Sequence, residues 1–198
     1  MTPEFTKLLD EVRASFAAHQ SLREFCDFPT DLSEQPVEPY FIPAARLMEE
    51  DGDLFSPDHA ALRDAVIAAS PVAQWRETYT GTRIAELFRD RFACYCFIGN
   101  GGPYAAPDMG AYFVYMPAGL YYPFHHHPAE ELYFIIAGEA EFMLEGSDSK
   151  TLGPGEHVFH PSMRPHATQT YDHPFLALVL WRGDLSVTPV LTNPEDGP

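Results

Sequence analysis

GLYYPFHHHPAEELYFIIAG, residues 119–138, places three consecutive histidines and two glutamates ahead of an apolar run. The residues before Pro128 have the pattern of a strand, the proline bends the chain, and residues 129–138 form a returning strand. Successive side chains of a strand point to opposite faces. We therefore expect His125 and His127 to share one face of the first strand and His126 to point the other way.

On the returning strand the same alternation places Glu131, Tyr133 and Ile135 on one face. If this face meets that of His125 and His127 across the interior of a β-fold, two imidazoles, a carboxylate and a phenol gather at one point. Two histidines and a carboxylate are common ligands of a divalent metal ion. The segment therefore predicts a metal site.

A further ligand is expected from another strand. GEHVFHPSMRPHATQT, residues 155–170, contains His157, His160 and His166. His166 follows two prolines and begins a new strand-like run, where a turn can direct it inward, so it is the favoured ligand. His157 and His160 are predicted to be structural or partly exposed. The donor set suits Zn, Fe, Mn, Co or Ni, and the residues do not choose among them.

The pattern of the chain changes near residue 100. Helical spacing of apolar residues predicts helices over 2–16 and 56–70, with a further helix or turn over 80–92 and a proline-rich extended connection over 27–43. Short strand-like runs separated by Gly, Pro and Asp follow Asn100, which predicts a β-sandwich or barrel. We expect one compact domain: a mainly helical segment 1–99, a β-barrel with the metal site 100–190, and a flexible tail 191–198.

Charge and composition exclude several classes of protein. The formal net charge is −17 with only 12 Lys and Arg, so nucleic acid and anionic membranes are poor partners. The N-terminal residues lack the order of a secretory signal, and a cytoplasmic location is expected. Cys26, Cys94 and Cys96 are odd in number and are predicted to be small apolar side chains, without a disulfide or metal role. Edge strands can pair between subunits, so a homodimer is one expectation.

The spacing of these residues resembles the cupin family. The first cupin motif matches Gly119, His125, His127, Glu131 and Gly138, with five, one, three and six residues between them. The second matches Gly155, Pro161 and His166, and departs from the family at Met163, where Gly is usual, and at Thr170, where Asn is usual. The resemblance implies a mainly β cupin jelly-roll barrel with a metal held by His125, His127, Glu131 and His166.

Residues 100–185 and the helical leader further resemble the cupin-type dimethylsulfoniopropionate (DMSP) lyases of marine bacteria. This resemblance implies a carbon–sulfur lyase that converts a small zwitterion, DMSP, to dimethyl sulfide and acrylate by β-elimination. A metal ion would polarise the substrate carboxylate. Tyr133 is the favoured base because it shares the face of Glu131, and Tyr122 is either a second candidate base or a hydrogen-bond partner of the carboxylate.

The dimethylsulfonium group has no hydrogen-bond donor, but aromatic faces attract such cations. Trp181 is the favoured contact, and Tyr122 and Tyr121 are further candidates. The helical half is expected to cover the barrel mouth, with Trp75 or Tyr79 contributing. Two other functions remain open at this point: an iron-dependent cupin dioxygenase acting on a small thiol or catechol, and a non-enzymatic cupin that binds a small ligand.

Overall fold

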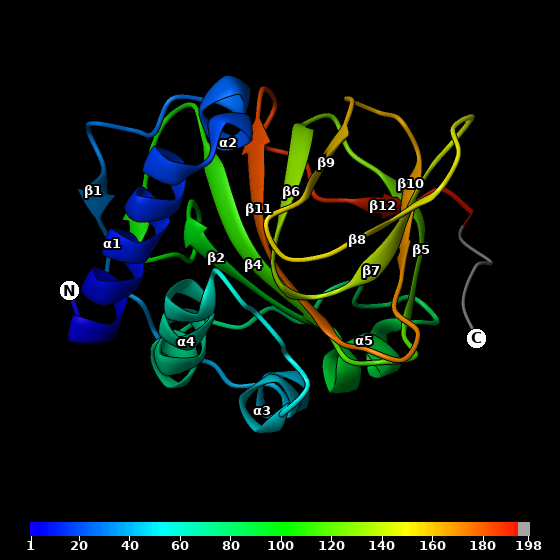
Figure 1. Cartoon of the computed structure of the whole chain (residues 1–198), viewed down its shortest axis with the longest axis horizontal. Helices are drawn as coiled ribbons and strands as arrows, with labels where there is room; N and C mark the ends of the chain where they lie inside the picture. Colours follow the sequence, from blue (N-terminus) through cyan, green and yellow to red (C-terminus); the bar gives the residue numbers. More distant parts are fainter. Residues whose placement is uncertain (194–198) are drawn as a thin grey trace.

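Two β-sheets face one another in the computed structural model, which describes residues 1–193, and helices cover the outside of the larger sheet (Figure 1). The larger sheet has the order β1 (Ser33–Glu34), β3 (Tyr104–Ala105), β2 (Ala93–Ile98), β4 (Gly110–Met116), β11 (Phe175–Arg182), β6 (Glu130–Gly138) and β9 (His157–His160). The smaller sheet has the order β12 (Val190–Leu191), β5 (Tyr121–His126), β10 (His166–Gln169), β7 (Ala140–Leu144) and β8 (Lys150–Leu152). Among the named strands of residues 1–193, β2 and β3 are the one pair that runs parallel. The mainly β class predicted from the sequence is confirmed.

Strand β6 explains why the quoted segment is so apolar. Leu132, Phe134 and Ile136 belong to the core between the larger sheet and the helices. Tyr133 and Ile135 belong to a second core between the two sheets. Both faces of β6 are therefore buried, which favours a near-continuous apolar run over strict alternation with polar residues.

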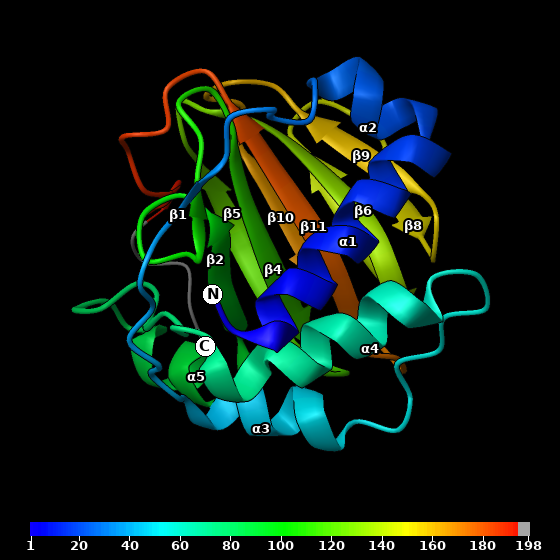
Figure 2. The same ribbon diagram turned by 90° about the vertical axis from the view of Figure 1, so that its left-hand side faces the viewer.

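Five α-helices lie outside the sheets in the described part of the chain: α1 (Pro3–Ala18), α2 (Gln20–Phe25), α3 (Pro43–Glu50), α4 (Ala60–Ala69) and α5 (Ala85–Arg91). A short 3₁₀ turn, η1 (Ser70–Val72), follows α4. Helix α1 crosses the outer face of the larger sheet beside α4 (Figure 2). It buries one apolar stripe there: Phe5, Leu8, Leu9, Val12 and Phe16. Its start at Pro3 agrees with the predicted helix.

The helical half differs in detail from the sequence prediction. The helix expected from residue 56 begins at Ala60, because the hydroxyl of Ser56 donates to the carbonyl of Ile136 at 2.6 Å and does not cap the helix. Helices α2 and α3 were not predicted. Strand β2 lies before residue 100 yet pairs with β4, so the sheet begins earlier than the predicted boundary.

The expected tail 191–198 also starts too early. Leu191 pairs with His125 through β12, and the amide of Thr192 donates to the carbonyl of Phe124 at 2.8 Å. The first residues of this segment are thus part of the smaller sheet. Residues 194–198 of the predicted tail lie outside the described residues.

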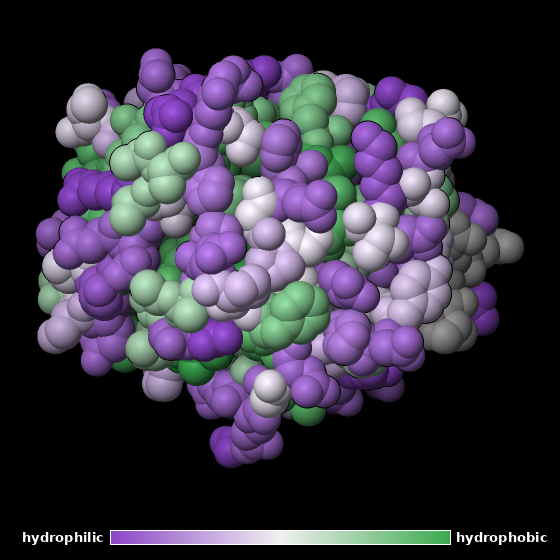
Figure 3. Space-filling view, viewed as in Figure 1, coloured by the Kyte–Doolittle hydropathy of each residue, from purple (hydrophilic) through white to green (hydrophobic). Residues whose placement is uncertain are grey.

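Hydrophilic side chains cover most of the face shown in Figure 3. Within residues 1–193, no helix combines the length and the apolar character needed to cross a bilayer.

Gly138 ends β6 in a turn that only glycine fits. Its φ is +68°, and a Cβ built there would lie 1.8 Å from the carbonyl oxygen of Pro174. We expect Gly138→Ala to lower the free energy of unfolding by ~1–3 kcal/mol, the usual magnitude of backbone strain. Denaturant unfolding measures the change. Gly52→Ala is the control because a Cβ there meets nothing within 4 Å, and equal stability of the two variants would contradict the prediction.

Candidate metal centre and cavity

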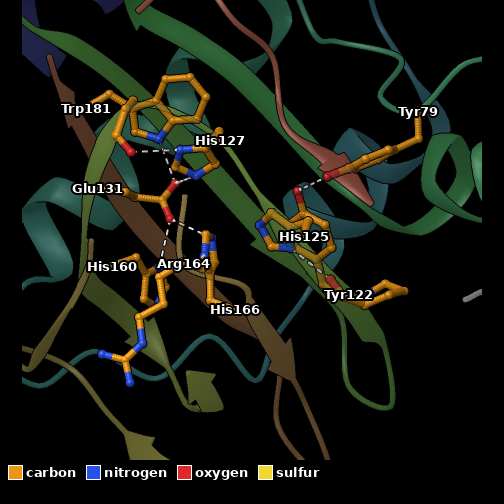
Figure 4. Close-up of polar contacts among 11 residues, drawn as sticks. Tyr79, Tyr122, His125, His127, Glu131, His160, Arg164, His166 and Trp181 are labelled. Carbon is orange, nitrogen blue, oxygen red and sulfur yellow. Dashed lines mark hydrogen bonds and ion pairs between the residues drawn. The ribbon is translucent and has the colours of Figure 1, made fainter. Parts of the chain in front are cut away.

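Four buried side chains converge between the two sheets (Figure 4). Strands β5 and β10 are neighbours, and their register places His125 opposite His166. Glu131 enters from β6 on the facing sheet. Its Oε1 lies 3.5 Å from Nε2 of His127, and its Oε2 lies 3.1 Å from Nε2 of His166. The structure therefore brings together the four residues predicted as metal ligands.

Local backbone geometry fixes the tautomer of the three histidines. In each ring Nδ1 bonds a backbone carbonyl oxygen two residues away, which can only accept, so Nδ1 carries the proton. The pairs are His125 with Pro123 at 2.8 Å, His127 with Ala129 at 3.0 Å, and His166 with Arg164 at 2.9 Å. In the neutral ring the lone pair of Nε2 then faces the centre. The Nε2 atoms of His127 and His166 are buried without a hydrogen-bond partner.

This arrangement favours a cation at the centre. Burial alone would favour a protonated Glu131, but His127, with His160 and His166, holds the pKa of its carboxyl well below the usual range. Although burial opposes it, the same carboxylate raises the pKa of His127. Wherever a ring is neutral, its Nε2 lone pair faces the carboxylate of Glu131, and a positive charge between them, a proton or a bound cation, stabilises the pair. The ligand atoms of His125, His127 and His166 lie within 4.8 Å of one another. Buried histidine and glutamate side chains that can bind a metal ion are therefore present.

His160 is a member of the cluster that the sequence prediction missed. It is fully buried, and its Nδ1 lies 2.8 Å from Oε2 of Glu131. Its ring stacks on that of His166 with centroids 4.0 Å apart. The prediction that it is structural or partly exposed overlooked the register of β6 and β9, which places Glu131 opposite His160. His157, on the same strand, is exposed as expected.

Trp181 contacts the cluster directly. Its Nε1 donates to Oε1 of Glu131 at 2.6 Å, and its ring stacks on His127 with centroids 4.4 Å apart and 29° between the planes. Both oxygens of the Glu131 carboxylate thus accept a hydrogen bond from a buried side chain. The sequence prediction had placed Trp181 near the substrate without this bond to Glu131.

The cluster opens into a cavity of about 680 Å³. Its walls include residues of the two sheets, His125, Glu131, Tyr133, Tyr122, Trp181, Val190 and Leu191, and residues of the segment before α5, Arg76, Tyr79 and Thr82. Tyr122 stacks on His125 with centroids 3.8 Å apart, and its hydroxyl lies 2.6 Å from that of Tyr79. The cavity therefore has an aromatic wall beside the cluster.

Three other predicted residues do not line this cavity. Tyr121 is 41% exposed, because alternation along β5 turns it away from the face of Tyr122. Trp75 is buried in the helix-side core, where its Nε1 donates to the carbonyl of Ser70 at 3.1 Å. His126 bonds the hydroxyl of Thr192 at 3.0 Å and points away from the cluster, as expected.

The departures from the cupin motifs have local explanations. Met163 adopts φ +61°, the left-handed region that favours glycine, and its amide donates to the carbonyl of His127 at 2.9 Å. Thr170 is buried, and its hydroxyl accepts from the amide of Leu120 at 2.9 Å and donates to the carbonyl of Pro117 at 2.6 Å. Neither residue contributes to the cluster, so both substitutions leave the ligand set intact.

The chain matches the family model for dimethylsulfoniopropionate lyase over residues 18–177. It is 62% identical over 193 residues to the dimethylsulfoniopropionate lyase DddQ of Ruegeria pomeroyi. The matched region covers 98% of this chain and 96% of that protein. The chain belongs to the dimethylsulfoniopropionate lyase family. The family predicted from the histidine motifs is thus confirmed.

Solved structures agree with this family. The crystal structure of DMSP lyase DddQ from Ruegeria pomeroyi DSS-3 matches with a TM-score of 0.97 and 60% identity over the whole of both chains. A chain from the crystal structures of the DMSP lyases RdDddP and RnDddQII matches with a TM-score of 0.90 and 34% identity, over 96% of this chain and 98% of that one. The similarity spans the helical half as well as the two sheets.

The two tyrosines predicted as catalytic, Tyr133 and Tyr122, both have a raised pKa, which favours the protonated phenol. Burial, reinforced by the charge of Glu131, raises the pKa of Tyr133 well above its ordinary value. Burial and the neighbouring hydroxyls of Tyr79 and Tyr133 do the same for Tyr122. A positive charge in the cavity would oppose both shifts. A phenolate at Tyr133 therefore requires a positive charge nearby.

Proposed function

We propose that this protein is a metal-dependent DMSP lyase, with the metal held by His125, His127, Glu131 and His166 and with Tyr133 as the base. One observation carries the proposal: in a chain of this family, the phenol of Tyr133 lines the same cavity as the histidine–glutamate cluster. The dioxygenase and the non-enzymatic alternatives have no such support. Proton NMR of a DMSP digest tests the proposal, which requires acrylate and dimethyl sulfide to appear in equal amounts.

The proposed reaction needs one base. Tyr133 would first lose its own proton to solvent. Its phenolate oxygen would then take the proton on the carbon next to the substrate carboxylate, the electron pair of that C–H bond would become the new C=C bond, and the C–S bond would break with its electron pair going to sulfur. Dimethyl sulfide leaves as a neutral molecule, so no general acid is required. The proton on Tyr133 returns to solvent before the next turnover.

A divalent ion, when bound, would act as a Lewis acid toward the substrate carboxylate and lower the pKa of a nearby phenol. The chain supplies the rest of the environment. Glu131 and the imidazoles of His125, His127 and His166 would form an N₃O donor set that suits zinc, iron, manganese, cobalt or nickel. Elemental analysis of protein purified without added metal identifies the ion.

Aromatic side chains are proposed to hold the dimethylsulfonium group. Trp181 and Tyr122 line the cavity on either side of the cluster, and Tyr112, whose ring meets Trp181 edge-on at 5.2 Å, extends the same wall. Their faces attract a cation that offers no hydrogen bond. Tyr121 is not part of this proposal because its side chain lies outside the cavity.

Tyr122 is proposed to orient the substrate carboxylate. Its hydroxyl already bonds that of Tyr79 at 2.6 Å, so one lone pair or proton remains for a ligand. We expect Tyr122→Phe to lower kcat/KM for DMSP about tenfold, the effect of one lost hydrogen bond. Initial rates of acrylate formation measure it. A loss as large as that of Tyr133→Phe would instead favour Tyr122 as the base.

A further inference from the structure

Each oxygen of the Glu131 carboxylate accepts a hydrogen bond from a buried side chain. Trp181 donates to Oε1 at 2.6 Å and His160 donates to Oε2 at 2.8 Å (Figure 4). Nδ1 of His160 lies within hydrogen-bond distance of a carboxylate oxygen, which accepts, so Nδ1 of His160 carries the proton. The ring of His160 is fixed as well, since it is fully buried and stacks on His166 with 21° between the planes.

The bonding of His160 differs from that of the three proposed ligand histidines. Each of those donates Nδ1–H to a backbone carbonyl and turns Nε2 toward the centre. His160 instead donates Nδ1–H to Glu131, one of the proposed ligands. Side chains that bond a metal ligand in this way fix its orientation and commonly affect metal affinity strongly.

We infer that His160 is a positioning residue for the metal site: its Nδ1–H orients the Glu131 carboxylate, and the side chain does not itself bind the ion. The inference rests on the proposed metal ligands. It assigns a role to β9, because the β6–β9 register alone places His160 opposite Glu131. Glu131, His160 and His166 also lie close enough to form a ligand group, so the experiment must separate positioning from ligation.

Two substitutions make this separation. In His160→Asn the amide nitrogen is attached to Cγ, as Nδ1 is in histidine, so the donor to Glu131 is kept. In His160→Gln the amide nitrogen takes the place of Nε2, so that donor is lost. His157→Asn is the matched control, since His157 lies on the same strand and is exposed.

Competition with a chromogenic chelator gives the Kd for Zn²⁺, and the visible spectrum of the Co²⁺ form reports ligand geometry. We expect His160→Gln to weaken binding about 10–100-fold and to change the Co²⁺ spectrum, while His160→Asn and His157→Asn stay within about threefold of the wild type. Equal Kd values and spectra for the wild type and His160→Gln would overturn the inference while leaving the proposed metal site standing. Tight binding by His160→Gln with loss in His160→Asn would make His160 a ligand through Nε2. A wild type that binds no metal would remove both proposals.

A measurement on the wild type covers the case in which a variant does not fold. In ¹⁵N NMR spectra recorded before and after Zn²⁺ loading, we expect the Nε2 signals of His125, His127 and His166 to move to the metal-bound range. The His160 ring should keep its Nδ1–H signal, and its Nε2 should stay outside that range. A metal-bound shift of either His160 nitrogen would overturn the inference.

Discussion

Tyr133→Phe is expected to lower kcat for dimethyl sulfide release by about 10²–10⁴-fold, the usual contribution of a positioned general base. The substitution removes only the phenolic oxygen and keeps the ring that packs against Phe142 and His160. The fold and the bound metal should therefore be unchanged. Steady-state rates, together with elemental analysis of the same samples, measure both quantities.

Tyr95→Phe is the control for this variant. Tyr95 is equally buried, lies in the helix-side core, and has a hydroxyl without a hydrogen-bond partner. Its loss should leave kcat at the wild-type value. Wild-type kcat in fully metal-loaded Tyr133→Phe would show that another group removes the proton.

His127→Ala is expected to abolish stable metal binding and to lower activity about 10³-fold or more, since metal-ion catalysis supplies several kcal/mol of transition-state stabilisation. His127 contributes a buried Nε2 that has no hydrogen-bond partner and lies 3.5 Å from Oε1 of Glu131. Its removal also takes away the ring on which Trp181 stacks. Elemental analysis and initial rates of acrylate formation give the two results.

His126→Ala tests the specificity of that loss. The two histidines are adjacent in the chain, but His126 points toward Thr192 on the outer side of the smaller sheet. We expect its metal content and rate to match the wild type. Equal losses of metal and activity in both variants would mean that the histidine run stabilises the strand and does not bind the metal.

The site could be predicted largely from local rules. Alternation along a strand places His125 and His127 on one face, and the same rule places Glu131 and Tyr133 on one face of the returning strand. These residues lie within a short segment, so no knowledge of the tertiary fold is needed to group them. His166 required the second motif, and the structure brings it opposite His125 through the β5–β10 register.

His160 and the hydrogen bond of Trp181 could not be predicted in the same way. Both depend on which strands flank β6 and on the register of those strands, which the connections and the core determine together. Likewise, Ser56 has the sequence of a helix cap but bonds Ile136 on the sheet. Tertiary contacts override the local pattern at each of these positions.

The central claim is that the histidine–glutamate cluster and its metal make this protein a DMSP lyase. Headspace gas chromatography of dimethyl sulfide tests it most directly, with metal-loaded wild type, chelator-treated wild type and His166→Ala incubated with DMSP side by side. The account predicts release from the loaded wild type alone, and its recovery when metal is returned to the chelated sample. Absence of release from fully loaded protein, or an undiminished rate after chelation, would contradict it.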